Sequence, residues 1–250
     1  MTKLLEVHNL KKSYTTRNRI NQVIRGMSFT INTGEYCAIM GPSGSGKTTL
    51  LNIMAGIDDA DSGSVLISDE DIVQLSKSEM TLYRRDHIGV VYQDFNLIDS
   101  LTVKENIALP MHLEMMEPEE IDESIESVAQ QLGIKHLLNE SIYEISGGEL
   151  QRAAICRAII NKPDILLADE PTGNLDSKST EDVMKCFTKL NSENGITILM
   201  VTHDVFSASF CKKVIFLRDG DITHEIERGS ETREQFYKKI LTELDVQGDY

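Results

Sequence analysis

Eight consecutive residues have the composition of a phosphate-binding loop. They match the pattern G-x-x-x-x-G-K-[ST] at every position and are Gly41, Pro42, Ser43, Gly44, Ser45, Gly46, Lys47 and Thr48. Glycines allow backbone N–H groups to approach a phosphate chain, and a helix that begins here points its positive end at the phosphates. In such a loop the lysine reaches the β- and γ-phosphates, and the Thr48 hydroxyl binds Mg²⁺. The pattern therefore predicts binding of a nucleoside triphosphate with Mg²⁺.

The residues on either side of this loop supply the context that the motif requires. Residues 36–40 form an apolar run typical of a buried strand, and residues 49–54, beginning with Thr49, have the pattern of the first turns of a helix. A chance turn rich in glycine and serine is the alternative. Because strand, loop, lysine and helix occur in the required order, we favour the P-loop and include Thr49 among the nucleotide contacts.

Two carboxylates follow a later apolar run. Residues 165–168 are Ile-Leu-Leu-Ala and lead directly into Asp169 and Glu170, which is the Walker B pattern of a strand that ends in acidic side chains. A short Ser-Gly-Gly sequence, residues 146–148, lies upstream of this strand. Alone it indicates little more than a helix N-cap. Its spacing from a Walker B strand makes it more informative.

Residues 145–152, Ile-Ser-Gly-Gly-Glu-Leu-Gln-Arg, resemble the signature motif of ABC ATPases, usually written L-S-G-G-Q. The resemblance covers nearly the whole chain. It places Tyr14 where the family has an aromatic that stacks on the nucleotide base, Gln93 in the Q-loop, residues 171–176 in the D-loop and His203 at the switch histidine. A surface aromatic remains an alternative for Tyr14, and a hydrogen-bonded residue at a strand end remains one for His203.

The resemblance implies an ATPase that works as a pair of subunits. In the family, two copies enclose two ATP molecules, each held by the P-loop of one chain and by the signature residues of the other, here Ser146, Gly147 and Gly148. Glu170 would orient and deprotonate the attacking water, and His203 would hold the γ-phosphate. Mg²⁺ would be held by Asp169 through water, with Thr48 and Gln93 as further contacts. Gln93 would also report the presence of nucleotide to a transmembrane permease.

The residues after Gln93 are expected to form a loop that contacts this permease. Residues 94–98 mix polar and apolar side chains without a period, which suits a loop that lines a groove. The resemblance implies that this groove receives a short helix of the permease, and we expect Phe95 or Leu97 to anchor that helix. The alternative is that both side chains pack within the neighbouring helices.

The expected fold is α/β, a P-loop NTPase core with an antiparallel β subdomain and an inserted α-helical subdomain. One ABC ATP-binding domain is expected over residues 1–250, with the helical subdomain at about 94–150. Antiparallel strands are expected at 4–10, 23–31 and 64–67, with a turn at 17–19. After Walker B we expect helices at 177–190, 205–211 and 231–244, and strands at 196–201 and 213–217. The acidic residues at 117–126 predict a solvated helix face rather than a binding site.

Charge and cysteine usage limit the setting. A net charge of −15 argues against nucleic-acid binding and against direct docking on anionic lipid. The cysteines lack a C-x-x-C pair, and the surroundings of Cys37 and Cys156 favour core packing, so a reducing cytoplasm is expected. No apolar run approaches the roughly 20 residues that span a bilayer. We therefore expect the chain at the cytoplasmic face of the membrane, held there by the permease.

Longer matches suggest the subgroup. Residues 83–97, residues 101–107 and the sequence Pro-Thr-Gly-Asn-Leu-Asp resemble the group that holds macrolide-exporter, lipoprotein-release and bacitracin-resistance (Bce-type) ATPases. Residues 214–220 and 233–240 look most like the Bce type, which implies a role in antimicrobial-peptide resistance. Lipoprotein or macrolide export is one alternative, and a non-transport cassette that drives a mechanical or regulatory membrane complex is another. ABC ATPases of translation or DNA repair do not fit, since no second cassette or long coiled coil is present.

The signature segment departs from the family pattern at two positions. Ile145 replaces the usual leucine, and Glu149 replaces the usual glutamine. A carboxylate that pointed at a triphosphate would be repelled. We therefore expect Glu149 to face away from the nucleotide and to pair with a cation such as Arg152.

Overall fold

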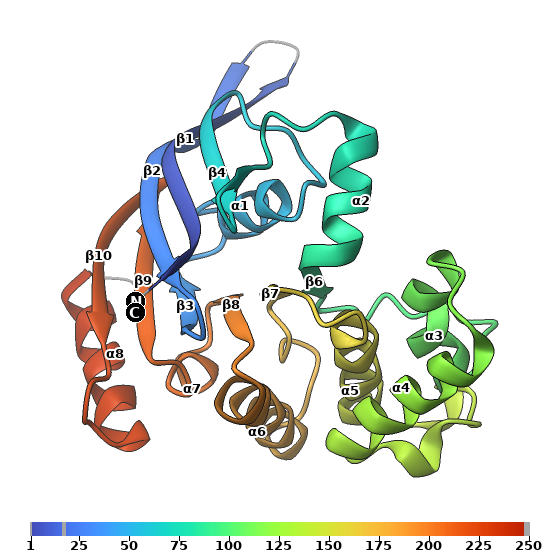
Figure 1. Cartoon of the computed structure of the whole chain (residues 1–250). Coiled ribbons are helices and arrows are strands. Elements are labelled where there is room, and N and C mark those ends of the chain that lie inside the picture. Colours follow the sequence, from blue (N-terminus) through green and yellow to red (C-terminus); the bar gives the residue numbers. More distant parts are fainter. Residues whose placement is uncertain (1, 17–18, 248–250) are drawn as a thin grey trace.

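The computed structural model describes residues 2–16 and 19–247, with only the backbone described at residues 16, 246 and 247. Two of the three residues of the turn expected at 17–19 therefore lie outside the described part. Two sheets and a group of helices make up the chain (Figure 1). Among the described helices, none combines the length and hydrophobicity that crossing a bilayer requires.

The smaller sheet is antiparallel and has the order β2-β1-β4-β5. Its strands are β1 (Lys3–Thr16), β2 (Arg19–Asn32), β4 (Ser62–Ile67) and β5 (Glu70–Asp71). The three strands expected here are confirmed, and β1 and β2 are longer than expected because they pair along their full length, from Lys3↔Asn32 to Thr16↔Arg19. This length carries Tyr14 out to the end of the sheet.

The larger sheet has the order β10-β9-β3-β8-β7-β6. It comprises β3 (Tyr36–Met40), β6 (Ile88–Val91), β7 (Ile165–Asp169), β8 (Thr197–Thr202), β9 (Lys213–Arg218) and β10 (Asp221–Glu227). All its pairings are parallel except that of β10 with β9. Parallel strands covered on both faces read as continuous apolar runs, which is why β3, β7 and β8 could be recognised in the sequence.

Alternate residues of β3 face two separate cores. Cys37 and Ile39 pack with the small sheet and with α1 (Lys47–Met54), which lies between the two sheets. Ala38 and Met40 pack on the other face with the remaining α-helices except the one at residues 77–87, whose Met80 belongs to the first core. Cys37 and Cys156 are fully buried, as expected from their surroundings in the sequence.

The helices α3 (Val103–Leu113), α4 (Pro118–Gln131) and α5 (Gly147–Ile159) lie together on one side of the molecule (Figure 1). Two short 3₁₀ helices, η1 (Lys135–Leu137) and η2 (Ile142–Glu144), connect α4 to α5. The first helix of this group begins at residue 103 rather than 94. The last continues to 159, beyond the expected boundary at 150, because its buried face extends to Ile159.

The remaining helices are α2 (Lys77–His87), α6 (Ser177–Asn194), α7 (Val205–Ala208) and α8 (Arg233–Gln247). The three helices expected after Walker B are confirmed, with α6 longer and α7 shorter than expected. α6 continues to the left-handed Gly195, which ends it. α2 and the strands β5 and β10 were not expected.

Candidate functional site

The P-loop joins the carboxyl end of β3 to α1, as the motif requires. A Cβ at Gly41 would lie 2.1 Å from the carbonyl oxygen of Leu217 on β9, so only glycine fits there. Gly46 is the N-cap of α1 and has a φ of 103°, a conformation that side chains disfavour. Within the described chain no side chain caps this helix end. Its first N–H groups therefore remain available to an anion.

Lys47 lies inside the loop rather than on the surface. It is 6% exposed, and its Nζ donates hydrogen bonds to the carbonyl oxygens of Gly41 at 2.8 Å and Pro42 at 3.0 Å. Burial lowers the pKa of Lys47, while the nearby Glu170 and Asp169 act in the opposite direction. The Ser45 hydroxyl is also buried here and has no hydrogen-bond partner among the described residues. A cation and an unpartnered hydroxyl inside a loop of this shape fit a bound phosphate chain.

Asp169 stands at the end of β7 beside the first turn of α1. Its Oδ1 lies 3.3 Å from the Thr48 hydroxyl, which donates to it. Burial raises the pKa of the Asp169 carboxyl, and the charge of Glu170 adds to this effect, against the hydrogen bond from Thr48. A hydroxyl and a carboxylate side by side form the oxygen donor set that Mg²⁺ prefers. The residues therefore fit the predicted cation.

Glu170 and His203 meet across the ends of β7 and β8. Glu170 has a φ of 43°, unusual for a residue with a side chain, and its N–H donates to the Val201 carbonyl at 2.9 Å. This conformation turns its carboxylate toward His203, whose Nδ1 lies 2.8 Å from Oε2. Both side chains line the same cavity as the P-loop.

That cavity has a volume of about 350 Å³. Its lining includes Gly41, Pro42, Ser43, Lys47, Glu170 and His203, so the structure brings together residues that lie more than 160 positions apart. Leu244 of α8 also lines it, which the sequence analysis did not predict. Leu244 shares an apolar face with Phe236 and Ile240, a signal that indicates only core packing.

Tyr14 is held in a defined orientation next to this site. Its hydroxyl donates to Oδ2 of Asp58 at 2.5 Å and lies 3.5 Å from the Thr49 hydroxyl. The ammonium of Lys12 lies 5.0 Å from the centre of the ring and is itself paired with Asp58. Tyr14 is 40% exposed, which leaves a surface for a base to stack on.

Gln93 follows β6 and contacts the turn after Glu170, which we call the D-turn (residues 170–176). Its Nε2 donates to Oδ1 of Asn174 at 3.2 Å. Within the described chain no hydrogen bond joins Gln93 to Thr48 or Asp169. The metal contact expected of Gln93 therefore stays a prediction.

The signature residues lie at the start of α5. Ser146 is the N-cap, and Oε2 of Glu149 accepts hydrogen bonds from its N–H at 2.8 Å and from its hydroxyl at 2.6 Å. These hydrogen bonds lower the pKa of Glu149, with a smaller contribution from the charge of Arg152. The expected pairing of Glu149 with Arg152 is therefore corrected: Ser146 is its hydrogen-bonded partner, because the capping geometry satisfies an otherwise unpaired N–H.

The signature residues do not join the cavity of their own chain. Ser146, Gly147 and Gly148 are absent from its lining, and no hydrogen bond between described residues connects them to the P-loop. Gly148 is instead buried against α6, where an added Cβ would lie 3.0 Å from the side chain of Ser179. The P-loop cavity and the signature segment of one chain thus have different surroundings.

Comparison with known proteins agrees with this geometry. The family model described as ABC transporter matches residues 24–173. The ABC transporter ATP-binding protein YxdL of Bacillus subtilis is 50% identical over 249 residues, covering 99% of this chain and 96% of that protein. The bacitracin export ATP-binding protein BceA of Halalkalibacterium halodurans is 43% identical over 245 residues, covering 98% and 97%.

A solved structure is similar along most of the chain. It is the dimeric post-hydrolysis state of the ATP-binding cassette MJ0796 bound to ADP and Pi, with a TM-score of 0.83, 38% identity, and coverage of 90% of this chain and 98% of that one. A protein of that name from Methanocaldococcus jannaschii is 40% identical over 226 residues. On this evidence the chain belongs to the ABC transporter family and is one of its ATP-binding subunits, an ATPase.

Proposed function

We propose that two copies of this ATPase close around two MgATP molecules and thereby drive a membrane permease that protects against antimicrobial peptides. The observation that carries the proposal is the separation of the two half-sites. The P-loop, Glu170 and His203 share one cavity, whereas the signature residues 146–148 contribute nothing to it in the same chain. A second copy would supply them. The dimeric form of the related MJ0796 cassette supports this arrangement.

The site residues divide the work of phosphoryl transfer to water. Bound Mg²⁺ would neutralise charge on the β- and γ-phosphates. Thr48 and Asp169 would hold the ion, with Gln93 as a further contact, and Lys47 would exchange its two loop carbonyls for phosphate oxygens.

Glu170 would accept the proton of the attacking water. His203 holds one carboxylate oxygen of Glu170 through Nδ1. With both ring nitrogens protonated, Nε2 would donate to the γ-phosphate, while the second carboxylate oxygen of Glu170 would accept from the water. The two residues would therefore act as one unit that places the water and the phosphate together.

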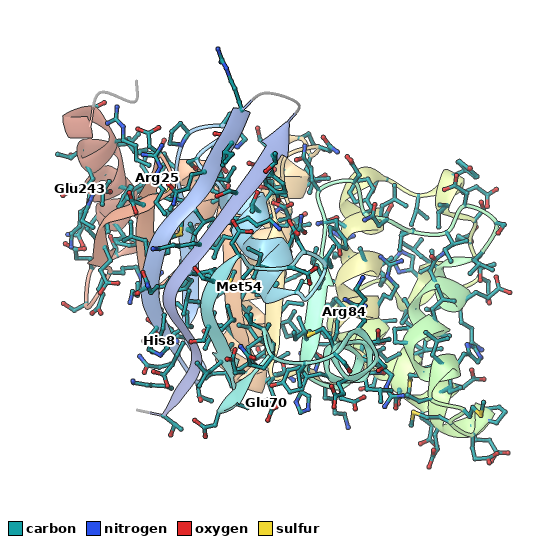
Figure 2. All side chains as sticks on the ribbon, turned by 90° about the horizontal axis from the view of Figure 1, so that it is seen from above. His8, Arg25, Met54, Glu70, Arg84 and Glu243 are labelled. Atoms are coloured by element: carbon teal, nitrogen blue, oxygen red, sulfur yellow. The ribbon has the colours of Figure 1, made fainter. Side chains whose placement is uncertain are left out.

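Permease docking is proposed at a groove between α1 and α2. The groove has a volume of about 780 Å³, and its lining includes Ile57, Asp58, Leu75, Arg84 and Tyr92. Arg84, labelled in Figure 2, fixes one wall by donating to the carbonyl oxygens of Ala55 at 3.3 Å and Gly56 at 3.0 Å. Ile57 is 50% exposed and offers an apolar contact to a helix of the permease.

Neither of the two anchors expected from the sequence lines this groove. Leu97 packs against the core of the helical side. Phe95 is half-buried, its φ is 60°, and Arg157 holds its carbonyl oxygen at 3.0 Å. We therefore propose Ile57 as the anchor. The chain would be held in this way at the cytoplasmic face of the membrane, without direct contact with lipid or nucleic acid.

The class of substrate is inferred from the relative named as a bacitracin export protein, which matches this chain over almost its full length. The test is resistance in the organism that encodes the chain. Deletion should increase sensitivity to bacitracin, and a plasmid copy of the wild type should restore resistance where a Glu170→Gln copy does not. Unchanged sensitivity to bacitracin and to other peptide antibiotics after deletion would contradict the proposed substrate class.

A further inference from the structure

Asn174 joins two loops that are far apart in the sequence. It lies in the D-turn (170–176), and its side chain contacts the loop after β6, which we call the Q-loop (residues 92–98). Its Nδ2 donates to Oδ1 of Asp94 at 2.8 Å and to the carbonyl oxygen of Gln93 at 3.3 Å. Its Oδ1 accepts from Nε2 of Gln93 at 3.2 Å. A single side chain therefore makes three hydrogen bonds to two consecutive residues.

The chemistry of these contacts requires an amide at position 174. Gln93 offers a donor to it, while Asp94 and the Gln93 backbone offer acceptors. Only a side-chain amide combines the two N–H donors and the acceptor oxygen that satisfy them together. An aspartate at position 174 would lose the donor and place its charge against the carboxylate of Asp94.

The backbone of the D-turn adds a close contact. A Cβ at Gly173 would lie 3.0 Å from both Cδ and Nε2 of Gln93. The missing side chain lets the Gln93 amide lie directly on the turn. This packing is independent of the hydrogen bonds of Asn174 and fixes the same pair of loops.

Each loop leads to a different part of the site. The N–H of Gly173 donates to the carbonyl oxygen of Glu170 at 3.0 Å. This hydrogen bond joins the D-turn to the backbone of the proposed base. On the other side, Tyr92 immediately precedes Gln93 and lines the groove proposed for the permease. The path from groove to base therefore runs through Tyr92, Gln93, Asn174 and Glu170.

We propose that Asn174 is a positioning residue that couples the Q-loop to Glu170, so that occupation of the groove sets the placement of the base. This inference rests on the roles proposed above for Glu170 and for the groove. Asn174 touches neither nucleotide nor water in this scheme. Its loss should lower the rate of hydrolysis much more than the affinity for MgATP, because Thr48 and Asp169 keep their proposed hold on the ion.

The experiment uses the complex of the chain with the permease that copurifies with it in detergent. Asn174→Ala and Asn174→Asp should each lower kcat by about 3-fold to 10-fold, the expected effect of losing one or two hydrogen bonds. KM and the Kd for MgATP measured by calorimetry should change much less than kcat, because the proposed contacts of Lys47, Thr48 and Asp169 remain, and Tm should stay at the wild-type value. Asn139→Ala, which changes an exposed asparagine between η1 and η2, is the matched control.

Exchanging the amide of Asn174 with the carboxylate of Asp94 tests whether the loss of kcat comes from the lost hydrogen bond or from a general change in structure. Combining Asp94→Asn with Asn174→Asp restores one amide–carboxylate hydrogen bond with the donor and acceptor reversed. At least half of the lost kcat should return. If the double variant is no faster than Asn174→Asp, or if both single variants keep wild-type kcat, the inference is overturned.

Two further variants keep the outcome decisive. If Asn174→Ala lowers Tm, the Gly173→Ala variant is used in its place. The added methyl group displaces the Gln93 amide and leaves Asn174 intact. An unchanged kcat in Gly173→Ala would then contradict the coupling. Glu170→Gln, assayed in the same complex, tests the proposed function separately. Hydrolysis at the wild-type rate in Glu170→Gln would refute the role of Glu170. If Glu170→Gln loses hydrolysis but the Asn174 variants keep wild-type kcat, only the coupling is refuted.

Discussion

Oε2 of Glu170 lies 2.8 Å from Nδ1 of His203, and the strands that carry them are hydrogen-bonded neighbours in the large sheet. The pairing Asp169↔Val201 places both residues just beyond the carboxyl ends of their strands. Since His203 engages one carboxylate oxygen, the carboxylate cannot rotate freely. The contact with His203 thus gives the Glu170 carboxylate a fixed direction.

Replacing Glu170 with glutamine should remove the proposed base and leave its shape. We expect hydrolysis to fall by about 10²-fold to 10⁴-fold, because an amide cannot accept the proton of water. MgATP should still bind, and an ATP-bound dimer should accumulate on a gel-filtration column. Glu193→Gln on α6 serves as the control for a change of charge at an exposed glutamate. Turnover near the wild-type rate in Glu170→Gln would show that another group is the base.

Lys47→Ala should weaken MgATP binding by about 10-fold to 150-fold, the equivalent of roughly 1.5 to 3 kcal/mol for a charge-assisted hydrogen bond. Because Lys47 also holds the carbonyls of Gly41 and Pro42, Tm should be recorded with calorimetric affinity. Lys162→Ala, at an exposed position, is the control. Equal affinities in wild type and Lys47→Ala would rule out the P-loop assignment.

Tyr14 allows stacking to be separated from ring orientation. Tyr14→Ala should weaken MgATP binding by about 5-fold to 150-fold, since stacking of a base on an aromatic ring contributes roughly 1 to 3 kcal/mol. Tyr14→Phe keeps the ring but loses the hydrogen bond to Asp58, so a smaller loss of about 2-fold to 10-fold is expected. GTP should behave like ATP because stacking does not read a base edge. If Tyr14→Ala binds MgATP as wild type does, the tyrosine is only a surface aromatic.

Glu149 offers a test of charge in the signature segment. Glu149→Gln can still accept the N–H of Ser146 but removes a negative charge, so ATP-driven dimerisation in a Glu170→Gln background should strengthen by about 2-fold to 5-fold. Glu149→Ala loses the cap and should lower Tm instead. Weaker dimerisation in Glu149→Gln would show that the carboxylate itself is needed at the interface.

The lowered pKa of the Glu149 carboxylate predicts how its contribution to stability depends on pH. Hydrogen bonds from Ser146 lower the pKa of Glu149 below its usual value of 4.5. Its contribution to stability is therefore present above the pKa of the unfolded state and is lost as the pH falls through the folded-state pKa. The difference in Tm between wild type and Glu149→Gln should consequently depend on pH only in the acidic range, below about 4.5. A difference that grows on raising the pH above neutrality would contradict this assignment.

The P-loop, β7 and β8 could be predicted from the sequence. In each case an apolar run, which for the P-loop is β3, is followed by polar residues in a recognised order. Helix α2 was not predicted, although Ser76 and Glu79 form a capping box that marks its start. Glu149 was assigned the wrong partner because both Ser146 and Arg152 lie three positions away from it on one helix. The unsatisfied N–H at the helix start decided between them.

The contacts of Asn174 and Leu244 could not be found in the sequence for a different reason. Both sets of contacts join residues that are far apart in the sequence and adjacent only in the folded structure. An asparagine in a turn and a leucine on an amphipathic helix each have common local explanations, and no local pattern selects the tertiary one.

Leu244 has a practical consequence for work with this protein. The end of α8 forms part of the wall of the cavity that holds Lys47 and Glu170, while Phe236 and Ile240 anchor the same helix in the core. An affinity tag fused directly after α8 would begin within a few residues of that wall. Tagged preparations could therefore differ in turnover without any difference in folding, and kinetic constants should be compared between proteins tagged at opposite ends.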